Sequence, residues 1–246
     1  MAELDSNPPR LAYHLTEGAG PAVVFLCGYG SDMQGTKALA IEAWARRHKR
    51  AFLRFDYAGC GASEGAFEDQ TLETWRDDAL HLIDSLIDGP VVLVGSSMGG
   101  WLMLLVQRAR PERVKGLVGI AAAPDFTDWG FTTEQKMTLL QDGRIEEPSP
   151  YSDEPTVTTR GFYMSGEANK MLIEPIAFDG PVRLVHGQKD GDVPWENAPM
   201  LAGKLRSSAV QTWLVKDGDH RLSRDGDIAL IIRAIEDVLT CLQPQP

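Results

Sequence analysis

The chain has 246 residues, and its 24 basic and 35 acidic side chains give a formal net charge of −11. Hydrophobic residues make up 43% of the chain and charged residues 24%, which is typical of a folded globular protein and excludes an intrinsically disordered one. The acidic excess argues against a nucleic-acid partner and against an anionic membrane surface, because both attract clustered Lys and Arg.

Cysteine usage and the start of the chain bear on the compartment. Cys27, Cys60 and Cys241 are widely spaced and form no CxxC pair, so neither a disulfide scaffold nor a structural zinc site is expected. Residues 1–10 are acidic and contain prolines, unlike a signal peptide or a mitochondrial presequence. No apolar run approaches 18 residues, so no membrane span is expected. These features predict a cytoplasmic protein without a cofactor or metal and leave the oligomeric state open.

Short apolar segments alternate with longer helical patterns through most of the chain. The order is strand 22–27, helix 34–49, strand 51–56, helix 71–87, strand 91–95, helix 101–109 and strand 114–122, then strand 182–187, helix 195–206, strand 210–215 and helix 226–240. Strands without polar alternation, separated by helices, indicate a mostly parallel sheet covered on both faces. We therefore expect one α/β domain spanning residues 1–246.

Residues 124–178 interrupt this alternation. The segment contains several prolines and shows no strand pattern like those on either side of it. Its ten acidic and four basic residues give it a net charge of −6, more than half that of the chain. We interpret it as a cap insertion between two sheet strands, with a disordered loop as the alternative.

The sharpest motif is Gly95-Ser96-Ser97-Met98-Gly99, a GxSxG pattern. It lies between an expected strand and an expected helix, which is the context that a nucleophile elbow requires. At such a turn the residues two before and two after the serine must be small, and Gly95 and Gly99 meet this condition. We therefore predict Ser97 as the nucleophile, and not Ser96, whose turn would be crowded by larger neighbours.

A serine hydroxyl needs a positioned base, and five histidines are candidates. His14 lies in a strand-like segment near the N-terminus, and His48 and His81 fall on expected helices. His186 closes a strand, where a structural role is more common. His220 lies in a loop between the last strand and the last helix, and it follows the serine and a candidate acid in the chain. It is the predicted base.

The base needs a carboxylate that holds its tautomer and stabilises the imidazolium. The segment after strand 182–187 offers Asp190 and Asp192, and Asp190 completes the pattern H-G-x-x-D-x-x-V-P. Asp190 is preferred, with Asp192 and, less commonly placed, Asp125 as alternatives. The chain order Ser97, Asp190, His220 is that of an α/β-hydrolase fold.

Two backbone amides should stabilise the oxyanion of the reaction. One is expected from Met98, directly after the nucleophile. The other is expected from the loop after strand 22–27, where Tyr29 is preferred and Gly28 is the alternative. Cys27 ends this strand and is interpreted as a core residue, not as a thiol nucleophile.

Four segments carry a resemblance narrower than the fold: GYGSDMQGTKALAIEAW (28–44), FLRFDYAGCGASEG (52–65), VGSSMGGWLML (94–104) and VRLVHGQKDGDVPW (182–195). They resemble the α/β-hydrolase subfamily of the mitochondrial palmitoyl-protein thioesterase, also described as mycophenolic acid acyl-glucuronide esterase. The resemblance covers nearly all the core and fades across 124–178. It implies a serine esterase or thioesterase with Ser97, Asp190 and His220 as its triad, acting on a small-molecule or acylated substrate.

The leading hypothesis is hydrolysis of a carboxylic ester or thioester through an acyl-Ser97 intermediate. Carbon–carbon bond hydrolysis or perhydrolysis by the same triad is the alternative among enzymes, and a non-catalytic binding protein on a hydrolase fold is the alternative outside them. Met and aromatic side chains in and near 124–178 suggest a pocket for a medium-to-long acyl chain. The alternative is that most of them form the core of the cap itself, which is the more common case for any one of them. The residues concerned are Trp101, Trp129, Phe131, Met137, Phe162, Tyr163, Met164, Met171 and Trp195.

Overall fold

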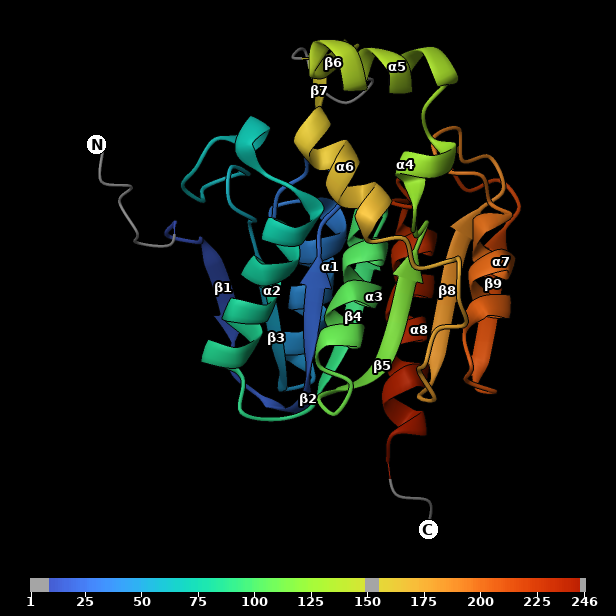
Figure 1. Ribbon diagram of the computed structural model, residues 1–246. Coiled ribbons are helices and arrows are strands. Elements are labelled where there is room, and N and C mark those ends of the chain that lie inside the picture. The colour runs from blue at the N-terminus through green and yellow to red at the C-terminus, as the bar shows by residue number, and fades with distance from the viewer. Residues whose placement is uncertain (1–8, 149–154, 244–246) are drawn as a thin grey trace.

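The computed structural model describes residues 9–148 and 155–243, and these ranges contain a central sheet of seven strands (Figure 1). The strand order is β1-β3-β2-β4-β5-β8-β9. All neighbouring strands are parallel except β1 and β3, which are antiparallel. The predicted mostly parallel α/β sheet is confirmed. The strands are β1 (Tyr13–Thr16), β2 (Ala19–Leu26), β3 (Arg50–Phe55), β4 (Val91–Ser96), β5 (Val114–Ile120), β8 (Val182–Gly187) and β9 (Val210–Val215).

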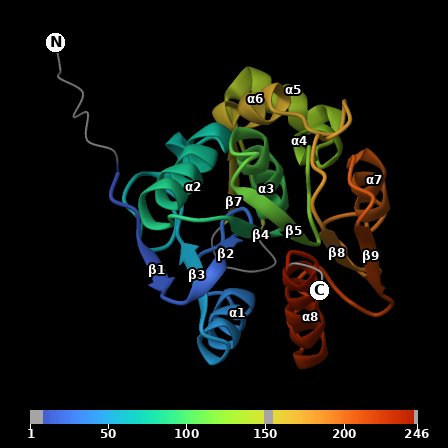
Figure 2. The same ribbon diagram turned by 90° about the horizontal axis from the view of Figure 1, so that it is seen from below.

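Helices cover both faces of this sheet, as Figure 2 shows. Helices α1 (Thr36–Arg47) and α8 (Asp225–Cys241) lie on one face, and α2 (Leu72–Leu86), α3 (Met98–Ala109) and α7 (Asn197–Lys204) lie on the other. Every residue of β4 and β8 is buried, which explains why these strands read as continuous apolar runs rather than alternating ones. Thr71 caps α2, because its hydroxyl accepts from the Thr74 amide.

Two boundaries differ from the sequence-based expectation. Helix α3 begins at Met98, directly after Ser97 and within the GxSxG motif, because the chain turns from β4 into the helix at a single residue, Ser97. Strand β1 has four residues at the edge of the sheet, and none of them is fully buried. Such a strand carries no continuous apolar run, so it was expected only as a strand-like segment around His14.

The segment between β5 and β8 lies over one end of the sheet (Figure 1). It contains helices α4 (Phe126–Trp129), α5 (Thr133–Asp142) and α6 (Arg160–Ala168), with strands β6 (Arg144–Glu147) and β7 (Thr156–Thr159) paired as an antiparallel ribbon. Neither strand has the apolar pattern of the strands on either side of the insertion, because β6 and β7 are four-residue, mainly polar strands outside the main sheet. Residues 149–154 of this segment lie outside the described ranges, as do residues 1–8.

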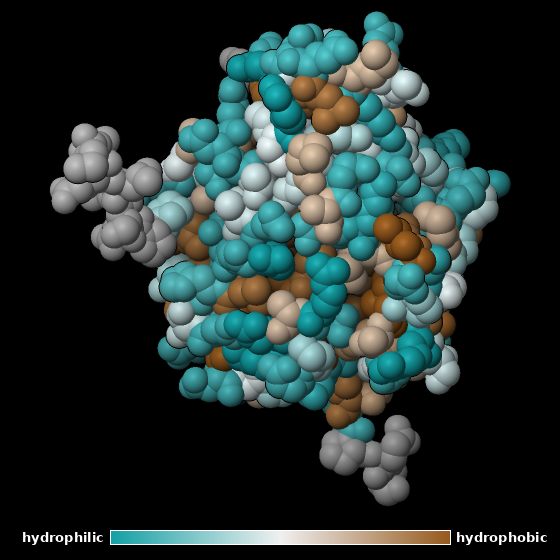
Figure 3. Space-filling view, in the orientation of Figure 1, coloured by the Kyte–Doolittle hydropathy of each residue, from teal (hydrophilic) through white to brown (hydrophobic). Residues whose placement is uncertain are grey.

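The insertion has a small apolar cluster of its own, formed by Leu139, Ile145 and Tyr163 with Phe131 against it. Some of its other apolar side chains join the main core, as Phe162 and Met171 do, while others such as Met137 and Met164 are exposed. The face in Figure 3 is mainly hydrophilic, with apolar residues in small separate groups. Within residues 9–148 and 155–243, no helix is long and apolar enough to cross a membrane.

Candidate active site

Ser97 occupies a sharp turn between β4 and α3, with φ +55° and ψ −122°. This backbone conformation is strained for a residue with a side chain, and the surrounding chain holds it in place. The Ser97 amide donates to the Ile120 carbonyl at 2.9 Å, and the Ser97 carbonyl accepts from the amides of Gly100 and Ala123 at 2.8 and 3.0 Å. The turn therefore fixes the direction of the serine hydroxyl.

The two glycines of the motif are required by the close packing of this turn. A Cβ atom on Gly95 would lie 2.3 Å from the Gly99 carbonyl oxygen, and one on Gly99 would lie 2.1 Å from the Leu26 carbonyl oxygen. Both distances are far shorter than any normal contact with a backbone atom. The sequence-based reason for small residues on either side of Ser97 agrees with this geometry.

His220 lies in the loop between β9 and α8, and its ring reaches Ser97. Its Nε2 atom is 3.2 Å from Ser97 Oγ, and its Nδ1 atom is 2.8 Å from Asp190 Oδ2. A carboxylate can only accept a hydrogen bond, so the ring proton of His220 lies on Nδ1, which donates to Asp190. The lone pair of Nε2 then faces the Ser97 hydroxyl. This arrangement can remove a proton from Ser97.

Asp190 follows β8, and its side chain is fully buried. Its Oδ1 accepts from the amides of Asp192 and Val193 at 2.9 and 2.8 Å, and its Oδ2 also lies 3.1 Å from His186 Nε2. Burial by itself would raise the pKa of this carboxyl. Hydrogen bonds from His186, His220 and the Val193 amide outweigh it and hold the pKa of Asp190 well below its usual range. Asp190 is therefore an anion beneath the His220 ring.

The other two acid candidates, Asp125 and Asp192, occupy different positions. Asp125 is buried and accepts from the amides of Met171 and Leu172 at 2.7 and 2.8 Å, so it holds the chain after α6. Asp192 is exposed, and its carboxylate lies within 4.8 Å of the ligand atoms of Asp190 and His220. Such a trio could offer three ligand atoms to a metal ion. The 2.8 Å hydrogen bond between Asp190 and His220 fits an acid–histidine pair better.

The other four histidines lie in the strands and helices expected from the sequence or directly after them. His186 is buried, and its Nε2 atom contacts Asp190 and the Val193 carbonyl, both at 3.1 Å, so it supports the acid loop. His14 lies in β1 and contacts Glu42 at 2.9 Å. His48 ends α1, and His81 lies in α2.

Two backbone segments adjoin Ser97, the start of α3 and the Gly28–Tyr29 loop. Met98 is the first residue of α3, so its amide has no partner within the helix. The Gly28–Tyr29 loop runs against Ser97, because a Cβ atom built on Gly28 would lie 3.3 Å from the Ser97 Cβ atom. Cys27 before it is buried, and burial raises the pKa of its thiol above the usual range, so the sulfur stays protonated.

A cavity of about 440 Å³ opens beside Ser97 and His220. The side chains that line it are mixed in character, with apolar groups such as Phe25, Phe67 and Val157 beside polar ones such as Asp32 and Lys37. The volume lies in the range of small-molecule binding pockets. Residues of β2, α1, β7 and the His220 loop therefore contribute to one site.

The nine Met and aromatic side chains expected to form an acyl pocket do not line this cavity. Trp101 is completely buried in the core, and Phe162 also belongs to it. Met137 and Met164 are about half exposed to solvent, at 53% and 50%. The acyl-pocket interpretation of these side chains was wrong, and the alternative of a packing role fits most of them, because they pack in the insertion and at its junction with the core.

Lys37 was not among the predicted site residues, although the segment that contains it carries part of the family resemblance. Its Nζ donates to the Arg221 carbonyl at 2.6 Å, next to His220. Burial and then the nearby Arg221 charge lower the pKa of Lys37 to about 8. No sequence signal pointed to this contact, because it joins residues 184 positions apart.

The seven-stranded sheet with a serine at the turn between β4 and α3 defines an alpha/beta hydrolase, and the chain belongs to that family: its sequence profile matches residues 23–230. The chain is 42% identical to the human protein named palmitoyl-protein thioesterase ABHD10, mitochondrial, over 235 residues, which cover 94% of this chain and 77% of that protein. The resemblance seen in the sequence is thereby confirmed.

Two solved structures have the same fold at similar identity. Mouse alpha/beta hydrolase domain-containing protein 10 aligns over 98% of both chains with a TM-score of 0.90 and 39% identity. A putative hydrolase from Agrobacterium vitis aligns over 96% of this chain and 95% of its own, with a TM-score of 0.90 and 38% identity.

Proposed function

We propose that this protein is a serine hydrolase that cleaves carboxylic esters or acyl thioesters through an acyl-Ser97 intermediate. The observation that carries the proposal is the hydrogen-bonded chain from Ser97 Oγ through His220 to the buried Asp190, at the wall of a cavity. The name of the human relative, a palmitoyl-protein thioesterase, adds support for an acyl substrate.

The proposed reaction has two stages. His220 Nε2 takes the Ser97 proton as Oγ attacks the substrate carbonyl, and the amides of Met98 and Tyr29 stabilise the resulting oxyanion. His220 then returns the proton to the departing alcohol or thiol, which leaves the acyl group on Ser97. A water molecule activated by His220 hydrolyses this ester, and the proton returns through His220 to Ser97.

Asp190 supports both stages without itself changing protonation. Its charge stabilises the imidazolium that forms in each stage, and its hydrogen bond holds the His220 tautomer. We also propose that residues 124–178 act as a cap, since Thr156 and Val157 from this insertion line the cavity beside Ser97.

Two other functions make different predictions. Carbon–carbon bond hydrolysis or perhydrolysis would use the same three residues on a different substrate, so activity toward simple esters and thioesters separates them. A non-catalytic binding protein would bind acyl compounds without forming a covalent adduct on Ser97.

A cytoplasmic location stays a prediction. The printed names of the human and mouse relatives contain the word mitochondrial.

A series of p-nitrophenyl esters and matched acyl thioesters tests the substrate class. We expect kcat/KM to rise from acetyl to butyryl to octanoyl, by up to about fourfold per methylene group, because each buried methylene gains about 0.8 kcal/mol. The gain should end where the chain outgrows the cavity of about 440 Å³. Palmitoyl substrates show whether kcat/KM stops rising with chain length. A preference for acetyl, or a flat profile, would contradict an acyl-binding site.

A further inference from the structure

Tyr29 lies where the Gly28–Tyr29 loop, next to Ser97, contacts the insertion. Its backbone follows Gly28, which packs against Ser97, and its ring is surrounded by aromatic rings from two sides. From the core, Phe67 and Trp75 have ring centroids 5.2 and 5.7 Å away. From the insertion, Phe162 and Phe126 have centroids 4.8 and 6.1 Å away. Tilted and edge-on contacts at these distances stabilise the ring position.

The Tyr29 hydroxyl reaches further into the insertion. It donates to the Val157 carbonyl in β7 at 2.6 Å. Burial raises the pKa of the Tyr29 phenol above its usual range, so the hydroxyl remains a donor across the working pH of an esterase. Val157 also lines the cavity beside Ser97. One side chain therefore connects a wall of the cavity to the loop that supplies a proposed oxyanion donor.

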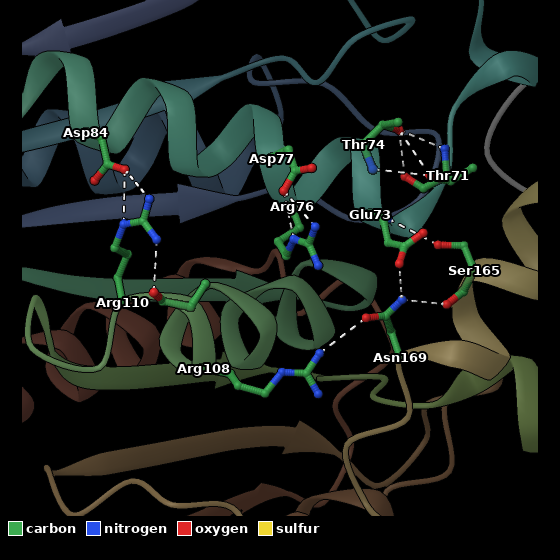
Figure 4. A network of polar contacts seen from close by, with 11 residues as sticks. Thr71, Glu73, Thr74, Arg76, Asp77, Asp84, Arg108, Arg110, Ser165 and Asn169 are labelled. Atoms are coloured by element: carbon green, nitrogen blue, oxygen red, sulfur yellow. Dashed lines mark hydrogen bonds and ion pairs between the residues drawn. The ribbon is translucent and has the colours of Figure 1, made fainter.

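The two ends of α6 are held by different contacts. At its C-terminal end, Asn169 accepts from Arg108 at 3.2 Å and donates to Glu73 at 3.1 Å, while the Glu73 amide donates to Ser165 at 3.2 Å (Figure 4). These contacts tie this end to α2 and α3. Strand β7 leads directly into the N-terminal end, where Tyr29 supplies a hydrogen bond from the core.

We propose that the Tyr29 side chain is a positioning residue: it sets the β7 wall of the cavity at a fixed distance from the Tyr29 amide. The carbonyl oxygen of a substrate that binds against β7 is then placed within hydrogen-bonding reach of the Tyr29 amide. This inference rests on the proposed hydrolysis by Ser97. It assigns the phenol a role in the reaction, separate from the amide of the same residue.

The substitution Tyr29→Phe tests this role because it keeps the backbone amide and the aromatic ring. Loss of one hydrogen bond that aligns the substrate should lower kcat for butyryl and octanoyl esters by about threefold to tenfold, with KM changed less than twofold. The rate of covalent labelling by a fluorophosphonate should fall by a similar factor. Hydrogen exchange of amides 156–159 should become faster, while amides of the β4 core stay protected.

Tyr57→Phe is the matched control. The Tyr57 hydroxyl is buried and donates to the Cys27 carbonyl at 3.4 Å, so the variant loses a phenol contact with the same loop but none with the insertion. We expect its kcat and labelling rate to stay within twofold of the wild type. If Tyr29→Phe has wild-type kcat and labelling, or if both variants lose kcat equally, the positioning role is wrong.

A double-mutant cycle tests whether the two side chains act together. Phe162→Leu removes the insertion ring nearest Tyr29, and the double variant Tyr29→Phe/Phe162→Leu should lose less kcat than the two single losses multiplied together. Independent effects would contradict a shared alignment role. An inactive and unlabelled wild-type protein would instead overturn the proposed hydrolysis itself, which keeps the two failures distinct.

Discussion

Ser97→Ala is expected to lower kcat for any ester or thioester substrate by at least about a thousandfold, because the residue that carries the acyl group is lost. The fold should persist, since Ser97 keeps its three backbone hydrogen bonds and its side chain caps no helix end. Steady-state kinetics measures the first effect, and thermal unfolding measures the second.

Ser96→Ala provides the control for this substitution. Ser96 is the neighbouring hydroxyl, is buried at the end of β4 and lines the same cavity. Loss of the Ser96 hydroxyl should change kcat by less than about tenfold, because the hydroxyl that contacts His220 is that of Ser97. Residual activity in Ser97→Ala above about one part in a thousand would contradict its role as nucleophile.

Asp190→Asn is expected to lower kcat by about three to four orders of magnitude, while Asp192→Asn lowers it by less than tenfold. An amide at position 190 can present a donor to His220 Nδ1, which favours the tautomer with the proton on Nε2 and so removes the base. Asp192 is exposed, and the His220 hydrogen bond goes to Asp190. Steady-state kinetics of the two variants on one ester compares them directly, and reversed effects would assign the acid to Asp192.

The same carboxyl should contribute to stability in a defined pH range. Because the folded pKa of Asp190 lies below its unfolded value, the stabilisation is complete above the unfolded value, about 3.9. It is lost as the pH falls below that value and through the folded pKa. Asp190→Asn should therefore lower the unfolding free energy at pH 7 and flatten this part of its pH dependence. Equilibrium denaturation across pH 3–7 measures both, with Asp192→Asn as the control.

The sheet and the serine turn were predictable because their constraints are local. Strands such as β4 are buried on both faces, so they appear as unbroken apolar runs. The glycines at 95 and 99 are required by clashes with backbone atoms, which leave few alternatives in the sequence. The approach of His220 to Ser97 could also be inferred, since this fold brings the ends of parallel strands to one edge of the sheet.

The cavity lining could not be predicted in the same way. The aromatic residues of the insertion have the composition of a binding pocket, yet Phe162 packs into the core and Tyr163 into the insertion's own cluster. Composition does not tell whether an apolar side chain lines a binding cavity or packs in a core. The polar strands β6 and β7 and the contact from Lys37 to Arg221 depend on tertiary pairing, for which the sequence holds no local signal.

Covalent labelling of the wild-type protein with a fluorophosphonate, followed by peptide mapping, tests whether Ser97 is the nucleophile. We predict one adduct per chain on Ser97, absent from Ser97→Ala and formed far more slowly in Asp190→Asn. An unlabelled folded protein, or an adduct on another residue, would contradict the assignment of Ser97 as a nucleophile activated by His220 and Asp190.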